Sequence, residues 1–171
     1  KLAALAVDGR ITDGTHPLLI GATSDTRGQT RANHEISFVD TGLTDYQIIV
    51  DHLKRRGQTV FVIDQSKDGF TQIANDLTGS KNISAIHIFS HAERGVLQLG
   101  SGLIGTEDLV RFKSQLITIG QSLAANGDIL LYGCDLAQGQ AGQNFISSLS
   151  QITGADIAAS INGTGAKALG G

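Results

Sequence analysis

The only cysteine of the chain, Cys134, follows an apolar run that is typical of a buried strand, "ILLYGC". His91 follows a second such run, "ISAIHIFS". Cysteine catalysis needs a thiolate, a base that generates it, and N–H donors for the developing oxyanion. If the two strands are neighbours in a parallel sheet, both side chains emerge at one sheet edge, where an imidazole can approach a thiol. The two residues therefore predict a nucleophile and its general base.

Packing is the competing interpretation, because a free cysteine is among the most buried residue types. Taken alone, Cys134 favours packing, and His87, inside the same run as His91, is interpreted as structural. The remaining histidines are scattered without metal-ligand spacing, so no metal site is predicted. The sequence contains no GxGxxG, no P-loop and no G-x-S-x-G motif. We therefore expect no cofactor and no serine nucleophile.

From Glu35 onward, short apolar runs alternate with stretches of helical spacing. The predicted strands are 36–40, 59–64, 83–90, 128–133 and 155–160; the predicted helices are 45–57, 68–79, 106–127 and 142–154, with a hairpin or loop over 95–105. This alternation predicts an α/β domain with a parallel sheet and helices on both faces. The carboxyl ends of the predicted strands carry Asp40, Asp64, His91, Cys134 and Ser160.

Composition bounds the class of protein. A chain of 171 residues is typical of one domain, and its net charge of −3 gives no basic footprint for nucleic acid. No apolar run approaches the ~18 residues that a membrane helix needs, and one cysteine cannot form an internal disulfide. The chain contains no Met, so Lys1 is not a translation start and we expect a processed product or a trimmed fragment.

Residues 1–34 differ from the rest, with two apolar runs, Leu2–Val7 and Leu18–Ile20, separated by turn residues. We interpret them as an N-terminal arm and linker, and 35–171 as the α/β domain with a glycine-rich tail. An apolar arm this short cannot bury itself. It is expected to pack on its own domain, or to add a strand to a neighbour and so build a homo-oligomer, including an open-ended polymer.

The stretches "IHIFSHAERGVLQLG", "DILLYGCDLAQGQAG" and "TGADIAAS" together resemble a caspase-like domain of unknown function. That domain is found near the N-terminus of large bacterial adhesin-type surface proteins, and it is similar to the CHAT and gingipain-like branches of the caspase-fold cysteine peptidases. The resemblance covers residues 35 to about 171. It implies a three-layer α/β fold whose mainly parallel sheet of about five strands has the order 2-1-3-4-5. It also implies an extracellular or cell-surface location.

The resemblance implies a role for each matching residue. His91 would be the general base and acid, Cys134 the nucleophile, and the backbone N–H groups of Ala92 and Cys134 the oxyanion hole. The family usually reads His-Gly where this chain has His91-Ala92, with a glycine only at Gly95. A glycine that is required for an unusual backbone angle, or for close approach of the substrate, would not be replaceable by alanine.

Asp40 matches the region that usually lines the primary specificity pocket, and Asp135 and Ser160 would border it. An acidic pocket would suit a basic residue before the scissile bond. Asp40 equally fits a cap for the turn at Thr41-Gly42.

Two functions follow. The first is a cysteine endopeptidase that cleaves a peptide or its own parent polypeptide. The tail "TGAKALGG" is the feature that suggests self-processing. The second is a catalytically silent extracellular module that assembles into a fibre or filament through residues 1–34. Neither requires nucleic acid or a membrane span.

Overall fold

The computed structural model describes residues 4–5, 11–12 and 34–161 of the chain. The chain divides into two units, residues 1–32 and 33–171. In the first unit, β1 (Ala4–Leu5) pairs antiparallel with β2 (Ile11–Thr12). The apolar run Leu18–Ile20 and the glycine-rich tail lie outside the described residues, and assembly through residues 1–34 stays a prediction.

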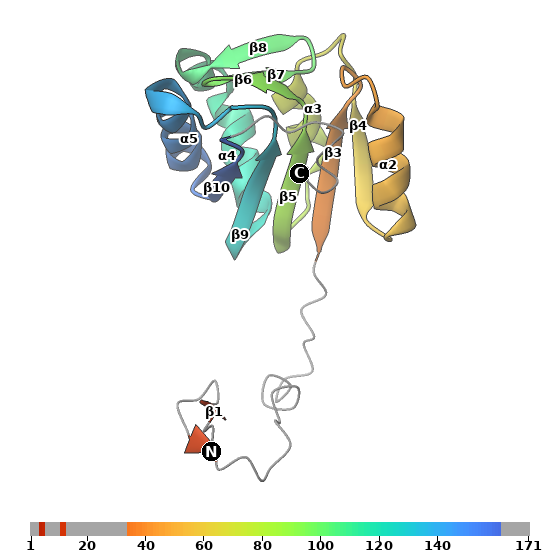
Figure 1. Cartoon of the computed structure of the whole chain (residues 1–171), viewed down its shortest axis with the longest axis vertical. Coiled ribbons are helices and arrows are strands. Elements are labelled where there is room, and N and C mark those ends of the chain that lie inside the picture. The colour runs from red at the N-terminus through yellow and green to blue at the C-terminus, as the bar shows by residue number, and fades with distance from the viewer. Residues whose placement is uncertain (1–3, 6–10, 13–33, 162–171) are drawn as a thin grey trace. The chain divides into compact units, whose positions relative to one another are not determined.

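A parallel sheet forms the centre of the second unit (Figure 1). Its strands are β3 (Glu35–Asp40), β4 (Thr59–Ile63), β5 (Ile83–Phe89), β9 (Leu123–Tyr132) and β10 (Asp156–Ala159). In the described part of the chain they follow the order β4-β3-β5-β9-β10, and every neighbouring pair is parallel. This confirms the α/β prediction and the strand order 2-1-3-4-5.

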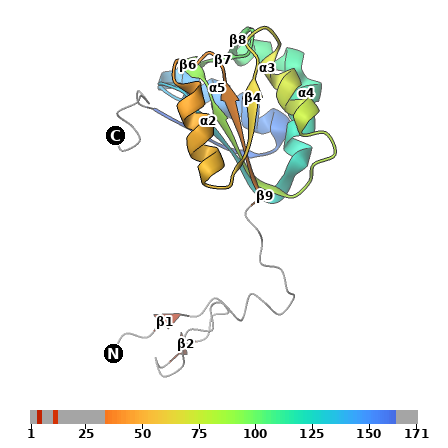
Figure 2. The same ribbon diagram turned by 90° about the vertical axis from the view of Figure 1, so that its right-hand side faces the viewer.

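Helices lie on both faces of this sheet, which gives three layers. The helices are α2 (Tyr46–Arg55), α3 (Gly69–Asp76), α4 (Lys113–Ser122) and α5 (Gly139–Thr153). Figure 2 shows α2 and the α3–α4 pair on opposite sides of the sheet. The helix α2 contacts β3 and β4, whereas α4 and α5 contact each other and reach β9 and β10.

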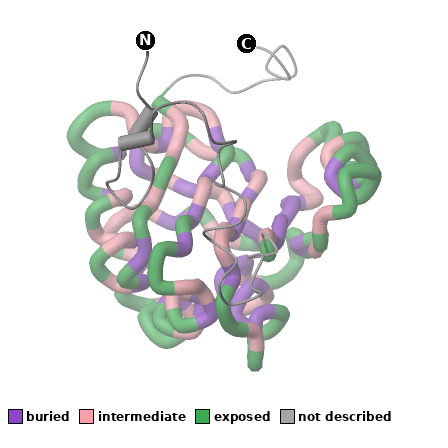
Figure 3. The backbone as a smooth tube through the Cα atoms, turned by 90° about the horizontal axis from the view of Figure 1, so that it is seen from below, coloured by how far each residue is buried: buried purple, intermediate pink, exposed green. Residues whose placement is uncertain are grey.

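Alternation along each strand divides the core between the two faces. On the face of α3, α4 and α5, Phe38, Ile86 and Leu131 belong to one large buried cluster. On the α2 face, Val39 forms a smaller cluster with Val50 and Leu53 of the helix. Figure 3 shows how buried and exposed residues follow one another along the backbone.

A second, antiparallel sheet interrupts the alternation after β5. It consists of β6 (His91–Glu93), β7 (Val96–Leu99) and β8 (Gly102–Gly105). The hairpin predicted over 95–105 is confirmed. The sequence did not predict β6, so His91 begins a short strand instead of ending one.

The helix predicted over 106–127 is wrong at both ends. Thr106–Phe112 forms a 3₁₀ helix, α4 begins at Lys113, and Leu123 already belongs to β9. Leu123 pairs with Ile83 of β5, followed by a register shift. Pairing with a neighbouring strand therefore outweighs the helical spacing of the apolar residues in this segment.

Candidate active site

The strands β5 and β9 are neighbours, as the Cys–His hypothesis requires, and they end together. Phe89 and Tyr132 are partners in the register, and their rings stack with centroids 4.4 Å apart. One residue further, the Ser90 N–H donates to the Tyr132 carbonyl at 3.2 Å. The segments that carry His91 and Cys134 therefore leave the sheet side by side.

The next residues of these two segments are in contact. A Cβ atom built on Gly133 would lie 2.5 Å from the Cβ of Ala92 and 3.4 Å from its amide nitrogen. Because real Cβ atoms do not approach that closely, the packing requires glycine at position 133. The residue before Cys134 thus lies against the residue after His91, with the Ala92 amide at the junction.

Ala92 has an ordinary extended backbone. It pairs with Leu97 in the antiparallel sheet, and among the described non-glycine residues only Asn82 and Asp135 have a positive φ. The left-handed residue of this segment is Gly95, with a φ of 71°. The alanine in place of the usual glycine after His91 therefore costs no backbone strain.

Three backbone hydrogen bonds hold the loop that follows Cys134. The Gly95 N–H donates to the Leu136 carbonyl at 3.0 Å, the Ala137 N–H to the Ser160 carbonyl at 3.1 Å, and the Gln138 N–H to the Asp135 carbonyl at 2.9 Å. The first bond ties this loop to the β6–β7 turn, and the second ties it to the end of β10. The loop is thus fixed to the segment that carries His91.

His91 is exposed and Cys134 is half-buried. Beside His91 lies an open hollow of about 280 Å³. It is lined by His91, Ala92, Glu93, Val96, Gln98 and Leu103. These residues all come from β6, β7 and β8, so the hollow lies on the antiparallel sheet beside His91, and Cys134 is not among the residues that line it.

The sequence profile of a domain of unknown function, DUF4347, matches residues 36–171. The chain belongs to this family. The comparisons with curated proteins and with solved structures gave no match.

In this DUF4347 domain the three residues predicted for a specificity pocket have different surroundings. Asp40 is buried, and its carboxylate accepts the Gly42 N–H at 2.7 Å and the Gly100 N–H at 2.6 Å. The bond to Gly42 is the turn cap that the sequence left open. Asp135 lies in the loop that follows Cys134, and its carbonyl accepts the Gln138 N–H. Ser160 lies outside this loop, and its carbonyl accepts the Ala137 N–H of the loop. Asp40 thus anchors the β7–β8 turn to the end of β3.

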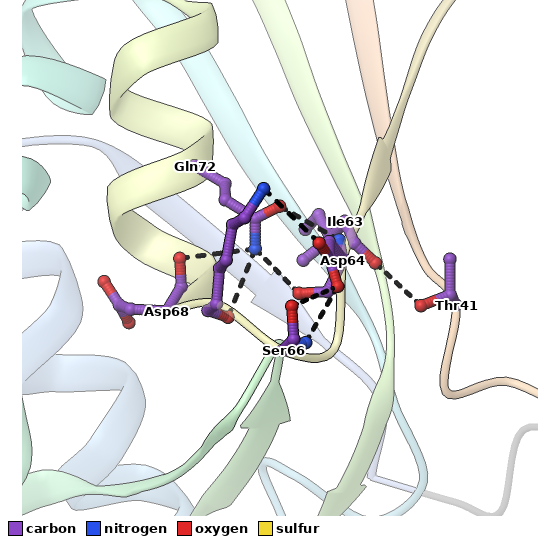
Figure 4. Close-up of polar contacts among 7 residues, drawn as sticks. Thr41, Ile63, Asp64, Ser66, Asp68 and Gln72 are labelled. Atoms are coloured by element: carbon purple, nitrogen blue, oxygen red, sulfur yellow. Dashed lines mark hydrogen bonds and ion pairs between the residues drawn. The ribbon is translucent and has the colours of Figure 1, made fainter.

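Asp64, at the end of β4, is also part of a turn (Figure 4). The Ser66 N–H and hydroxyl both donate to its carboxylate at 2.8 Å, and these bonds, the backbone one first, lower the pKa of Asp64. The Gln72 amide bonds to the backbone N–H and carbonyl of Asp64 at 2.9 Å each. Because β4 is an edge strand that β3 and β5 separate from β9, this turn lies away from Cys134.

Three hydrogen-bonded side chains form a row across β3, β5 and β9, on the face of the DUF4347 sheet that α2 partly covers. His87 Nδ1 lies 3.0 Å from the Tyr132 hydroxyl, and His87 Nε2 lies 3.3 Å from Glu35 Oε2. Burial, and then the charge of Glu35, raise the pKa of Tyr132. The sequence did not indicate this row, because only the register of three strands brings its members together.

Two buried polar atoms flank the candidate site without a hydrogen-bond partner among the described residues: Ser90 Oγ, beside His91, and Gln138 Oε1, in the Cys134 loop. Such atoms are rare in folded proteins; two others, Asp68 Oδ1 and Ser84 Oγ, lie elsewhere in the domain. In the described part of the chain no three His, Cys, Asp or Glu side chains gather as metal ligands. None of the described helices is long and apolar enough to cross a membrane.

Proposed function

We propose that this DUF4347 domain is a caspase-like cysteine peptidase, related to the CHAT and gingipain-like branches, in which His91 and Cys134 form the catalytic dyad. The contact between Ala92 and Gly133 carries the proposal, because it joins the segments of the base and the nucleophile. Two adjacent parallel strands hold these segments, so the dyad rests on rigid elements.

The chemistry follows the roles of cysteine peptidases. The His91 imidazole takes the proton of the Cys134 thiol, and the thiolate attacks the carbonyl carbon of the scissile peptide bond. The N–H groups of Ala92 and Cys134 stabilise the oxyanion. The C–N bond breaks, the leaving amine takes the proton from His91, and a thioester remains on Cys134. Water then hydrolyses the thioester, with His91 as base.

Local features beside the dyad support a functional site over simple packing. Asp135, directly after Cys134, has a φ of 55°, a conformation that non-glycine residues adopt uncommonly and that recurs at active sites. Two of the four described buried side-chain oxygens without partners, those of Ser90 and Gln138, also lie in the segments of His91 and Cys134. A packing cysteine would require neither feature.

The substrate in this proposal is a peptide or the parent polypeptide, in a bacterial extracellular or surface protein of the adhesin type. In this proposal Asp135, in the loop that follows Cys134, and Ser160, at the end of β10, border the bound substrate. The hollow lined by the antiparallel sheet receives the substrate on the His91 side, where Glu93 supplies a negative charge. These placements favour a substrate that carries a basic side chain near the scissile bond.

The test combines cleavage and thiol reactivity. The full chain is incubated with a library of synthetic peptides and the products are identified by mass spectrometry, while a second assay follows alkylation of Cys134 by iodoacetamide at neutral pH. We expect cleavage to be lost in Cys134→Ala and in His91→Ala, and alkylation of Cys134 to slow in His91→Ala. His52→Ala is the matched control, because His52 is an exposed histidine of α2.

Self-processing is tested by expressing a longer precursor and following its size with and without Cys134→Ala. A precursor that is processed alike in both cases excludes self-cleavage but leaves cleavage of other substrates to the library assay. If no peptide is cleaved and alkylation does not depend on His91, the peptidase proposal is wrong. The catalytically silent extracellular module is then the better function.

A further inference from the structure

The helix α2 covers only part of its face of the sheet. It packs on β3 and β4, and its buried residues Val50 and Leu53 contact Val39. On the same face, among the described residues, no helix packs over β9 and β10. The exposed residues of these strands on this face are Asp128, Tyr132, Asp156 and Ala158. This half of the face therefore exposes two carboxylates, a tyrosine ring and an alanine to solvent.

The register arranges this bare face in rows, because partners in a parallel pair point to the same side. At the amino ends of the strands, Glu35, Ala85, Asp128 and Asp156 lie in one row. Two residues further, the row is Ser37, His87, Leu130 and Ala158. On β9 and β10, which no described helix covers on this side, the face is therefore acidic at one end, at Asp128 and Asp156, and apolar beyond it, at Leu130 and Ala158, up to Tyr132.

The outer side of α2 has the complementary pattern. Ile48, in its first turn, is 60% exposed, and its last residues and C-cap, Lys54, Arg55 and Arg56, are exposed and basic. Because α2 leads from the carboxyl end of β3 back to the amino end of β4, its basic end is level with the acidic row. Arg56 and Glu35 indeed line one hollow.

These two patterns fit each other in a two-fold symmetric pair. In this pair the two sheets face each other, and a two-fold axis parallel to the strands runs between them. This arrangement places α2 of each copy over β9 and β10 of the other copy. The same axis preserves strand direction, so Arg55 of one copy meets Asp128 and Asp156 of the other, and Ile48 lies toward Tyr132. An axis across the strands would instead place the two α2 helices on top of each other.

We propose that the bare face is the docking surface for a second copy of this chain, in an isologous dimer whose two α2 helices complete one shared layer. Charge complementarity between the basic end of α2 and the acidic row sets the orientation of this dimer. The proposal does not depend on peptidase activity, and its surface is distinct from the arm of residues 1–34.

Charge reversal tests the proposal in the full chain. We expect sedimentation equilibrium to show a dimer, and Arg55→Glu or Asp128→Arg to weaken it about tenfold or more, since each change places like charges at both symmetric contacts. Mixing these two variants is expected to restore a dimer that contains one copy of each. Each variant alone brings like charges together at both contacts, whereas the mixed pair, like the wild type, brings opposite charges together at both.

Lys113→Glu is the control, because Lys113 is an exposed base at the start of α4, on the other face of the sheet. It is expected to leave the mass unchanged, and circular dichroism verifies that every variant is folded. A chain that is monomeric at all concentrations overturns the proposal. A dimer that neither Arg55→Glu nor Asp128→Arg weakens also overturns it, and so does a dimer that is lost only when residues 1–34 are removed.

Discussion

Ala92 and Gly133 are in contact where β5 and β9 leave the sheet, and no side chain fits at position 133. The contact joins two segments that are distant in the chain and that carry the proposed base and nucleophile. A pair of small residues at this point lets the backbones approach closely, so the geometry of the candidate site depends on both.

Gly133→Ala is expected to destabilise the domain by about 1–3 kcal/mol, the usual cost of overpacking, because the new methyl group would lie 2.5 Å from the Ala92 Cβ. Urea unfolding measures this loss. Gly102→Ala is the matched control, because its nearest contact would be an ordinary 3.5 Å. Combining Gly133→Ala with Ala92→Gly should recover most of the stability; no recovery would mean that the two residues are not coupled.

Asp40→Asn separates a turn-anchoring role from a role in specificity. The Asp40 carboxylate accepts two backbone N–H groups, whereas an asparagine has one acceptor oxygen and an amide that faces the other N–H. We expect a loss of about 2 kcal/mol in the free energy of unfolding, with the pattern of cleaved peptides unchanged. Asp45→Asn, at an exposed position without a side-chain cap bond, is expected to have little effect. An altered cleavage preference at unchanged stability would instead place Asp40 in the specificity pocket.

The start of α3 offers a third stability test. Asp68 is the N-cap of α3 and accepts the Thr71 N–H at 2.8 Å, whereas Asp45 is the N-cap of α2 and makes no such bond. Asp68→Ala is therefore expected to cost about 1 kcal/mol and Asp45→Ala clearly less. Thermal unfolding of the two variants measures the difference. Equal losses would show that the cap bond contributes nothing.

The five parallel strands could be predicted because each contains a short apolar run bounded by turn residues, whereas their order was implied by the family resemblance. The predicted elements agree with the structure to within a few residues, apart from the unpredicted strand β6 and the segment after Gly105. There, Leu123 fits the helical spacing but pairs with Ile83. A pairing partner so far away in the sequence cannot be recognised from local pattern.

The position of the candidate site could be predicted for the same reason, since His91 and Cys134 each follow a buried strand. The contacts that surround these two residues could not be predicted. The bond between Asp40 and Gly100 and the contact between Ala92 and Gly133 depend on where β6, β7 and β8 fold over the sheet edge. The His-Gly pattern of the resembled family also left open a special backbone angle at position 92, whereas β6 holds Ala92 in an extended conformation.

The alkaline limit of stability depends in part on Tyr132. Burial, and then Glu35, raise its pKa above the ordinary value of 10.0, so the folded domain keeps the phenol proton at a pH where the unfolded chain has lost it. The folded state then binds more protons, and stability falls as pH rises from about 10 toward the folded pKa. We expect this decline to be shallower in Tyr132→Phe. Glu35→Gln should lower the pKa of Tyr132, measured by tyrosinate absorbance, because it removes the neighbouring carboxylate. Glu107→Gln, an exposed carboxylate of the 3₁₀ helix, serves as the control. An unchanged alkaline decline in Tyr132→Phe would contradict the assignment to this residue.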